Sequence, residues 1–187
     1  MAGCRWPDLS RYLVPVAKHV LLPFDPIRRA AELWRSRWGA GSDPLAMASA
    51  TSIMRVQQVL LGDFDAIVGQ HGLTFARYEA LVLLAFSQEG RLPMSKMGKR
   101  LMVHPTSVTN IVQRLVGQGL VERVPNPSDG RGMLARITPR GREIMEAATR
   151  DLVATGFSLG ALTPDEHVQL FALLRKVRVA AGDFSSQ

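Results

Sequence analysis

The chain has very little cysteine and few aromatic residues. Cys4 is the only cysteine among 187 residues, and aromatic side chains make up 6% of the sequence. One thiol excludes an internal disulfide, and no pair of cysteines has the spacing of a zinc site. A secreted, disulfide-bonded scaffold is therefore excluded, and a reducing cytoplasm is the expected location. We expect no metal and no cofactor.

Long apolar runs are also missing. Residues 13–24 form the one early stretch rich in apolar residues, but Pro15, Lys18, His19 and Pro23 interrupt it. A helix needs about 20 consecutive apolar residues to cross a bilayer. We therefore expect no membrane span and interpret this stretch as an amphipathic surface helix.

Acidic residues are outnumbered by basic ones. The chain carries 23 Lys or Arg against 16 Asp or Glu, which gives a net charge of +7. Residues 73–141 alone hold ten Lys or Arg against four Asp or Glu. Such a surface displaces counterions from phosphates and favours nucleic acid as a partner. A basic face that only keeps the protein soluble is the alternative that charge by itself leaves open.

The segment 105–118 predicts a helix with two different faces. Pro105 suits a first helical position, and apolar residues follow at helical spacing. This apolar stripe comprises Val108, Ile111, Val112, Leu115 and Val116. The opposite face is polar and comprises Thr106, Thr109, Asn110 and Gln113, flanked by Ser107 and Arg114. Side chains of these types hydrogen-bond to base edges and phosphates in the major groove of DNA.

The residues that follow predict a hairpin. Gly119 ends the helix, because glycine enters the left-handed region without steric cost. The sequence LVERV at 120–124 predicts a strand, residues 125–130 supply a turn, and 133–138 return as a second strand. With a short strand at 91–93 and a helix over about 94–102, these elements describe a winged helix-turn-helix. We interpret His104 as the cap of the second helix rather than as a DNA contact.

The segment 73–141 resembles the multiple-antibiotic-resistance regulator (MarR) family of bacterial transcription factors. Four motifs stand in the order of the family: Val108-Thr109, Gly119 to Arg123, Asp129-Gly130-Arg131, and Ile137 to Gly141. One departure is Gly130, where the family usually has a second basic residue. The resemblance implies a regulator, usually a repressor, that binds double-stranded DNA as a homodimer on a pseudo-palindromic site. It also implies release by a small-molecule effector, whose identity the sequence does not reveal.

The same resemblance suggests roles for individual side chains. Thr106, Thr109, Asn110 and Gln113 would contact base edges, and Ser107 and Arg114 would hold phosphates or a guanine. Arg131 would enter the flanking minor groove. Asp129 would support the wing, by accepting hydrogen bonds from its backbone or by orienting Arg131.

Long helices flank this unit. Apolar residues cover more than one side of the helix predicted over 44–71, so that helix needs more than one neighbour. Two further helices are predicted from Thr138-Pro139 and from Thr163-Pro164 to about Ala181. We expect these helices to form a dimerisation lobe, and a monomer is the alternative. The expected fold is mostly α (α+β), divided into an N-terminal helical extension (1–42), a dimerisation helix (43–72), a winged helix-turn-helix domain (73–141) and C-terminal dimerisation helices (142–187).

The N-terminal extension is outside the family motifs. Asp25-Pro26 predicts the start of a helix that ends at Gly39 and carries Trp34 and Trp38 on one face. We expect the tryptophans to dock on the dimerisation lobe. Direct contact of its arginines with DNA is the alternative.

Two other patterns suggest different chemistry. Gly156 to Gly160 match the GxSxG pattern of serine hydrolases. These hydrolases need a strand before the serine, but a helix is predicted before Ser158. We therefore interpret this segment as a helix–helix connection and expect no enzyme. Asp63, Asp65 and His71 do not converge on a metal site.

A winged-helix module that binds protein instead of DNA is the alternative function, and its binding would not fall steeply with salt.

Overall fold

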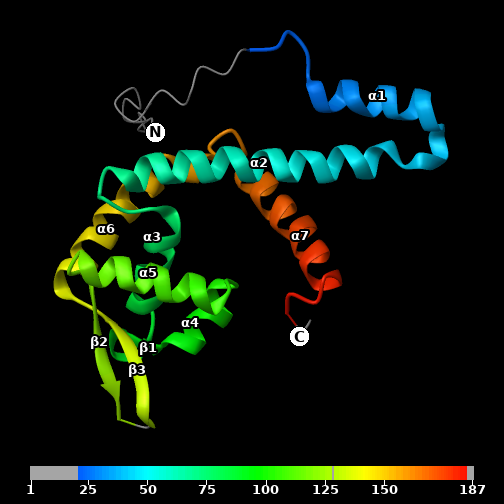
Figure 1. Cartoon of the computed structure of the whole chain (residues 1–187). Helices are drawn as coiled ribbons and strands as arrows, with labels where there is room; N and C mark the ends of the chain where they lie inside the picture. Colours follow the sequence, from blue (N-terminus) through cyan, green and yellow to red (C-terminus); the bar gives the residue numbers. More distant parts are fainter. Residues whose placement is uncertain (1–20, 128, 185–187) are drawn as a thin grey trace.

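The computed structural model describes residues 21–127 and 129–184. A long helix, α2, crosses the molecule, and the winged helix-turn-helix lies below its C-terminal end (Figure 1). Cys4, residues 13–20 and Ser128 lie outside the described residues, and residues 21–24, the end of the stretch interpreted as an amphipathic helix, are not helical. The α-helices are α1 (Pro26–Trp38), α2 (Pro44–Gly69), α3 (Phe75–Ala85), α4 (Met94–Leu101), α5 (Pro105–Gly117), α6 (Pro139–Ala154) and α7 (Pro164–Ala180).

Local sequence explains where most helices begin. Asp25, Asp43, Thr74, Thr138 and Thr163 are N-caps whose side chains accept hydrogen bonds from backbone N–H groups of the first turn. Such caps satisfy N–H groups that have no partner inside the helix. The helix positions predicted from these signals are confirmed to within about two residues, the usual uncertainty of a helix end.

One hydrophobic core holds the winged helix-turn-helix together. It joins α3, α4, α5, the strands and α6, and also includes the C-terminal end of α2. Fully buried side chains from four of these elements meet there: Val68 of α2, Leu81 and Leu84 of α3, Met97 of α4, and Leu152 of α6. This core places the surface of α5 relative to α2, because buried side chains interdigitate with few voids.

The wing is longer than the sequence predicted. Its strands are β2 (Val121–Asn126) and β3 (Asp129–Ile137), and β1 (Arg91–Pro93) completes an antiparallel sheet with the order β1-β3-β2. Pro125 therefore belongs to a strand, and the predicted loop over 125–130 was too long. Because β2 is an edge strand, it has a neighbouring strand on one side only, and a proline, which lacks the N–H group, is tolerated there. The register shifts between Pro125 and Asn126.

The N-terminal extension forms α1, which lies along the N-terminal half of α2 (Figure 1). Trp34 is half-buried, and its Nε1 donates a hydrogen bond to the carbonyl oxygen of Ser42 at 3.1 Å, within the turn that joins α1 to α2. Trp38 packs on Trp34 with ring centroids 4.5 Å apart. Because Trp38 stays 61% exposed, the expectation that both tryptophans dock was wrong for Trp38.

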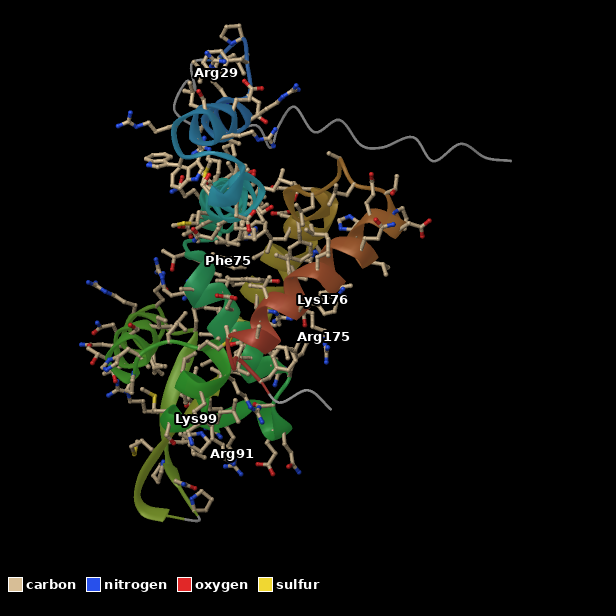
Figure 2. All side chains as sticks on the ribbon, turned by 90° about the vertical axis from the view of Figure 1, so that its right-hand side faces the viewer. Arg29, Phe75, Arg91, Lys99, Arg175 and Lys176 are labelled. Atoms are coloured by element: carbon tan, nitrogen blue, oxygen red, sulfur yellow. The ribbon has the colours of Figure 1, made fainter. Side chains whose placement is uncertain are left out.

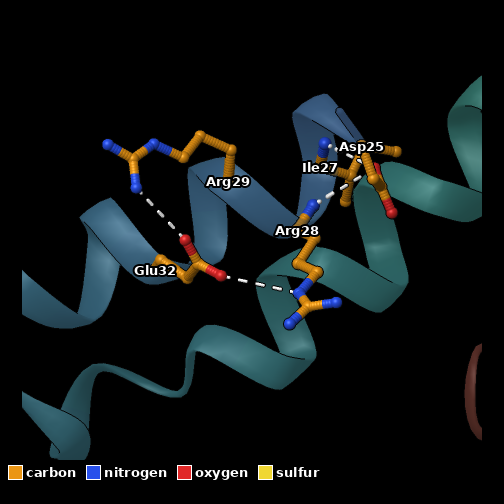
Figure 3. Close-up of polar contacts among 5 residues, drawn as sticks. All are labelled: Asp25, Ile27, Arg28, Arg29 and Glu32. Carbon is orange, nitrogen blue, oxygen red and sulfur yellow. Dashed lines mark hydrogen bonds and ion pairs between the residues drawn. The ribbon is translucent and has the colours of Figure 1, made fainter. Parts of the chain in front are cut away.

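Two arginines of α1 share one carboxylate. Glu32 lies between Arg28 at 3.5 Å and Arg29 at 3.3 Å, and Asp25 caps the helix start (Figure 3). Arg29 lies at the opposite end of the molecule from Lys99 and Arg91 (Figure 2). Within one chain, this placement favours the packing interpretation of α1 over contact of its arginines with the DNA that α5 would bind.

The long flanking helices expose much apolar surface. In α2 only Pro44, Ile67 and Val68 are buried, and α7 buries no residue. Large exposed apolar side chains of α2 include Leu45, Ile53, Met54, Val56 and Val59, and those of α7 include Val168, Phe171, Leu173 and Val177. Among residues 21–127 and 129–184, no helix is long and apolar enough to cross a membrane.

Candidate nucleic-acid interface

The helix α5 is held firmly by one face. Val108, Val112 and Leu115 are at most 1% exposed, and Ile111 is half-buried. Val116 is 37% exposed, so the predicted apolar stripe was correct except at its last member. This anchoring fixes which side of α5 faces solvent.

Both ends of α5 are capped as the sequence suggested. His104 is the N-cap, and its Nδ1 atom accepts a hydrogen bond from the backbone N–H of Thr106 at 3.3 Å. At the other end Gly119 has φ +72°, a left-handed conformation that favours glycine. The N–H of Leu120 then bonds to the carbonyl of Leu115 at 3.0 Å and that of Gly119 to Val116 at 2.9 Å, which is the Schellman arrangement.

The outward face of α5 carries side chains that are available for binding. Ser107, Asn110, Gln113 and Arg114 are exposed and have no side-chain hydrogen bond to any other described residue. Thr106 and Thr109 are also exposed, but their hydroxyl groups contact His104 Nδ1 and the carbonyl of Pro105. The structure therefore brings all six predicted residues of this helix to one accessible surface, and four of them have uncommitted polar groups.

Positive charge continues next to this surface. Lys96, Lys99 and Arg100 of α4 are exposed. Lys99 and Arg91 lie toward the wing end of the molecule (Figure 2). In the wing, Arg136 Nε lies 2.7 Å from Glu122 Oε1 across the two strands. Asp129 and Arg131 belong to β3, but only their backbone is described, so their predicted roles stay predictions.

A polar network beside α5 has no signal in the sequence. Arg77 of α3 donates from Nη1 to Gln118 Oε1 at 3.2 Å and to the carbonyl of Gly72 at 3.3 Å, and from Nε to Thr74 Oγ1 at 3.2 Å. Gln118 Nε2 donates to the same Gly72 carbonyl at 2.8 Å. The network joins the turn after α2 to the C-terminus of α5. In the sequence Arg77 is one of the ten basic residues of 73–141, and no local pattern indicates its contacts to residues far along the chain.

The other candidate sites have structural explanations. Ser158 lies in a short 3-10 helix, Gly156–Ser158, directly after α6, so no strand precedes it and the predicted helix–helix connection is confirmed. Asp65 Oδ1 accepts a hydrogen bond from the N–H of Phe75 at 2.6 Å, and His71 Nε2 lies 2.7 Å from Asp151 Oδ2. Asp65 and His71 therefore have separate partners, and no cluster of metal-ligating side chains occurs in the part of the chain that the structure describes.

Comparison with known sequences identifies relatives of this arrangement. A family model described as the MarR family matches residues 71–132. The multiple antibiotic resistance protein MarR of Salmonella typhimurium is 34% identical over 101 residues, which cover 51% of this chain and 68% of that protein. An uncharacterized HTH-type transcriptional regulator of Mycobacterium leprae is 33% identical over 81 residues. The chain spans about half the length of such mycobacterial relatives, 55% in this case.

Solved structures resemble a larger part of the chain. Sco5413, a MarR family transcriptional regulator from Streptomyces coelicolor, is 64% identical, with a TM-score of 0.70 over 75% of this chain and 98% of that one. Sco3205 from the same organism, solved in complex with DNA, is 28% identical with a TM-score of 0.64 over 69% and 82% of the two chains. CouR from Rhodococcus jostii, bound to p-coumaroyl-CoA, is 25% identical with a TM-score of 0.62 over 78% and 97%.

These likenesses agree with the geometry. The family model covers the α3–α5 region and the first part of the wing, and the relatives share the surrounding helices as well. The chain therefore belongs to the MarR family of winged helix-turn-helix transcriptional regulators.

Proposed function

We propose that this protein binds double-stranded DNA in a sequence-specific manner and regulates transcription as a homodimer. The observation that carries the proposal is the outward face of α5, on which Ser107, Asn110, Gln113 and Arg114 have no partner among the described residues. An amide bonds to two sites on adenine and a guanidinium to two sites on guanine, so these side chains suit base recognition. The relative Sco3205, which was crystallised with DNA, supports the proposal.

The second part of the proposal is the homodimer. Many large apolar residues of α2 and α7 stay exposed in one copy of the chain, and exposed apolar surface of this extent favours a protein partner. A twofold partner would place two copies of α5 about 34 Å apart, one turn of DNA. Each copy would then occupy one half of a pseudo-palindromic operator, and occupancy of the operator would repress transcription.

The third part of the proposal is release by a small molecule. A groove of about 530 Å³ between α3 and α6 is lined by Tyr78, Val82, Met145 and Thr149, among others. A ligand there would contact both the DNA-binding unit and the flanking lobe. It would lower DNA affinity if it bound more tightly to a dimer with the wrong spacing of the two α5 helices. The relative CouR, which binds p-coumaroyl-CoA, supports a small-molecule effector of some kind.

The test is selection of DNA sequences by the full-length protein from a random library, followed by anisotropy titrations on the selected site and on a scrambled one. We expect a palindromic site, affinity at least about 10³-fold tighter than for scrambled DNA, and a steep fall of affinity with salt. Asn110→Ala should cost about 1 to 3 kcal/mol and relax selection at one position of each half-site. Binding that ignores base order at every salt concentration would contradict the proposal and favour a protein-binding module.

A further inference from the structure

The groove beside the C-terminal half of α5 has the character of an anion site. It has a volume of about 780 Å³ and is lined by Arg77, Asn110, Gln113, Arg114, Gly117 and Gln118. Two of these residues are cationic and none is acidic. The predicted base contacts lie on one wall, whereas Arg77 comes from a different helix, α3, and belongs to no motif that the sequence analysis assigned to DNA binding.

The charge of Arg77 is not neutralised by a neighbour. All its hydrogen-bond acceptors are neutral: the hydroxyl of Thr74, the carbonyl of Gly72 and the amide oxygen of Gln118. Within the described residues no carboxylate lies at ion-pair distance from its guanidinium. Arg114 on the facing helix likewise makes no ion pair with a described residue. Two guanidinium groups on one groove, both without a counterion, create a positive potential that a phosphate would relieve.

The guanidinium of Arg77 is also held in place. Nε and Nη1 are occupied by the three bonds described above, while Nη2 has no partner among the described residues. A flexible arginine loses side-chain entropy when it binds a ligand, and bonds that already hold the group reduce this loss. The start of α3 itself is not the site, because Asp65 already accepts the N–H of Phe75.

We propose that Arg77 is a phosphate-binding residue that clamps the DNA backbone beside α5, with Gln118 and Gly72 holding its guanidinium in position. This inference rests on the proposed DNA-binding function and adds a contact from outside the helix-turn-helix and the wing. The phosphate would belong to the same half-site whose bases Asn110 and Gln113 contact. Since Gly72 follows α2, the contact would also make backbone binding sensitive to the position of the dimerisation helix.

The experiment compares three variants with the wild type on the selected operator. Arg77→Gln removes the charge, and Gln118→Ala removes the support but keeps the charge. Arg37→Gln is the matched control, because Arg37 is an exposed residue of α1 that makes no ion pair with a described residue. We expect Arg77→Gln to weaken binding about tenfold or more on any sequence and to make the salt slope shallower by about 0.9 for each phosphate that is no longer neutralised. Gln118→Ala should weaken binding less, and Arg37→Gln should behave like the wild type.

A second measurement separates a phosphate contact from a purely structural role. Each phosphate of one half-site is replaced in turn by an uncharged methylphosphonate. When the phosphate that Arg77 holds is replaced, the wild type should lose affinity for the operator, whereas the affinity of Arg77→Gln should not change. Replacement of any other phosphate should change the affinity of both proteins equally. If Arg77→Gln fails to fold, Arg77→Lys serves in its place, and we expect it to keep the salt slope with a weaker response at that phosphate.

The outcomes distinguish the two proposals. A wild type without sequence preference would overturn the proposed function. A wild type that binds its operator, together with an Arg77→Gln variant that matches Arg37→Gln, would overturn only the role of Arg77. A variant that binds weakly but keeps the wild-type response at every phosphate would also overturn it, since Arg77 would then act only through the fold.

Discussion

Gly141 packs directly against the backbone carbonyl of Leu120. A Cβ atom at Gly141 would overlap that carbonyl oxygen and would lie 2.9 Å from Cγ1 of Ile137. The same carbonyl accepts a hydrogen bond from the N–H of Thr138 at 3.0 Å. The first turn of α6 is therefore fixed to the turn that ends α5. The glycine in the family motif Ile137 to Gly141 is explained by this close approach and not by an unusual backbone angle.

Gly141→Ala should destabilise the protein by about 1 to 3 kcal/mol, because the methyl group can be accommodated only if backbone moves. The measurement is the free energy of unfolding from urea denaturation at a fixed protein concentration. Gly69→Ala is the control, since nothing lies within 4 Å of a Cβ at Gly69. Equal stability of Gly141→Ala and the wild type would show that α6 moves away from Leu120 at little cost.

Arg131→Ala should lower operator affinity by about 1 to 3 kcal/mol and reduce the dependence of binding on salt, because it removes a cation from the wing. Affinity is measured by anisotropy between low and physiological salt. Arg29→Ala changes the net charge equally at the far end of the molecule and serves as the control. If Arg131→Ala binds as tightly as Arg29→Ala, the wing does not contribute to DNA affinity.

Val177→Glu should convert the proposed dimer into a monomer. Val177 is 60% exposed on α7, and a carboxylate buried between two subunits without a partner is strongly unfavourable. Mass in solution by light scattering tests this expectation at several concentrations. Gln169→Glu places the same charge at an exposed polar position of α7 and should leave the mass unchanged. A Val177→Glu dimer as stable as the wild type would place the subunit interface elsewhere.

Acid should loosen the start of α7. The pKa of Glu166 lies below its ordinary value, first because its carboxylate accepts a hydrogen bond from the backbone N–H of Thr163 and second because it accepts one from the Thr163 hydroxyl. For a carboxyl group with a lowered folded pKa, the stabilisation is present above the unfolded pKa and is lost as the pH falls through the folded value.

Amide exchange of residues 164–168 measures this loss. Correcting for the intrinsic exchange rate at each pH, we expect protection in the first turn of α7 to fall between about pH 5 and pH 3. Glu166→Gln, which cannot ionise, should start with less protection and show no such fall. A wild-type profile as flat as that of Glu166→Gln would mean that the capping box does not hold this turn.

The helices and their order were predictable because their signals are local. Asp25, Thr138 and Thr163 cap the turns that follow them, and Gly119 ends α5 through its own backbone conformation. The outward set on α5 was predictable for the same reason, since helical spacing alone separates Asn110 and Gln113 from Val108 and Val112. The wing was predicted less well, because Pro125 and Asp129 favour turns in isolation but are tolerated in an edge ribbon.

Contacts between distant residues were not predictable from a single sequence. His71 bonds to Asp151, and Arg77 bonds to Gln118 and Gly72, yet no periodicity links these positions. The exposure of Trp38 is a similar case. A helical pattern shows which residues share a face, but the position of the next helix decides how far that face is covered.

The sequence by itself determined the helices, the polar face of α5 and the family to which the chain belongs, because caps, glycine stops and helical spacing act within a few residues. Only the tertiary structure decided which cations lack a counterion and which carbonyl leaves no room for a side chain. Those properties depend on distances between segments that packing of the common core brings together.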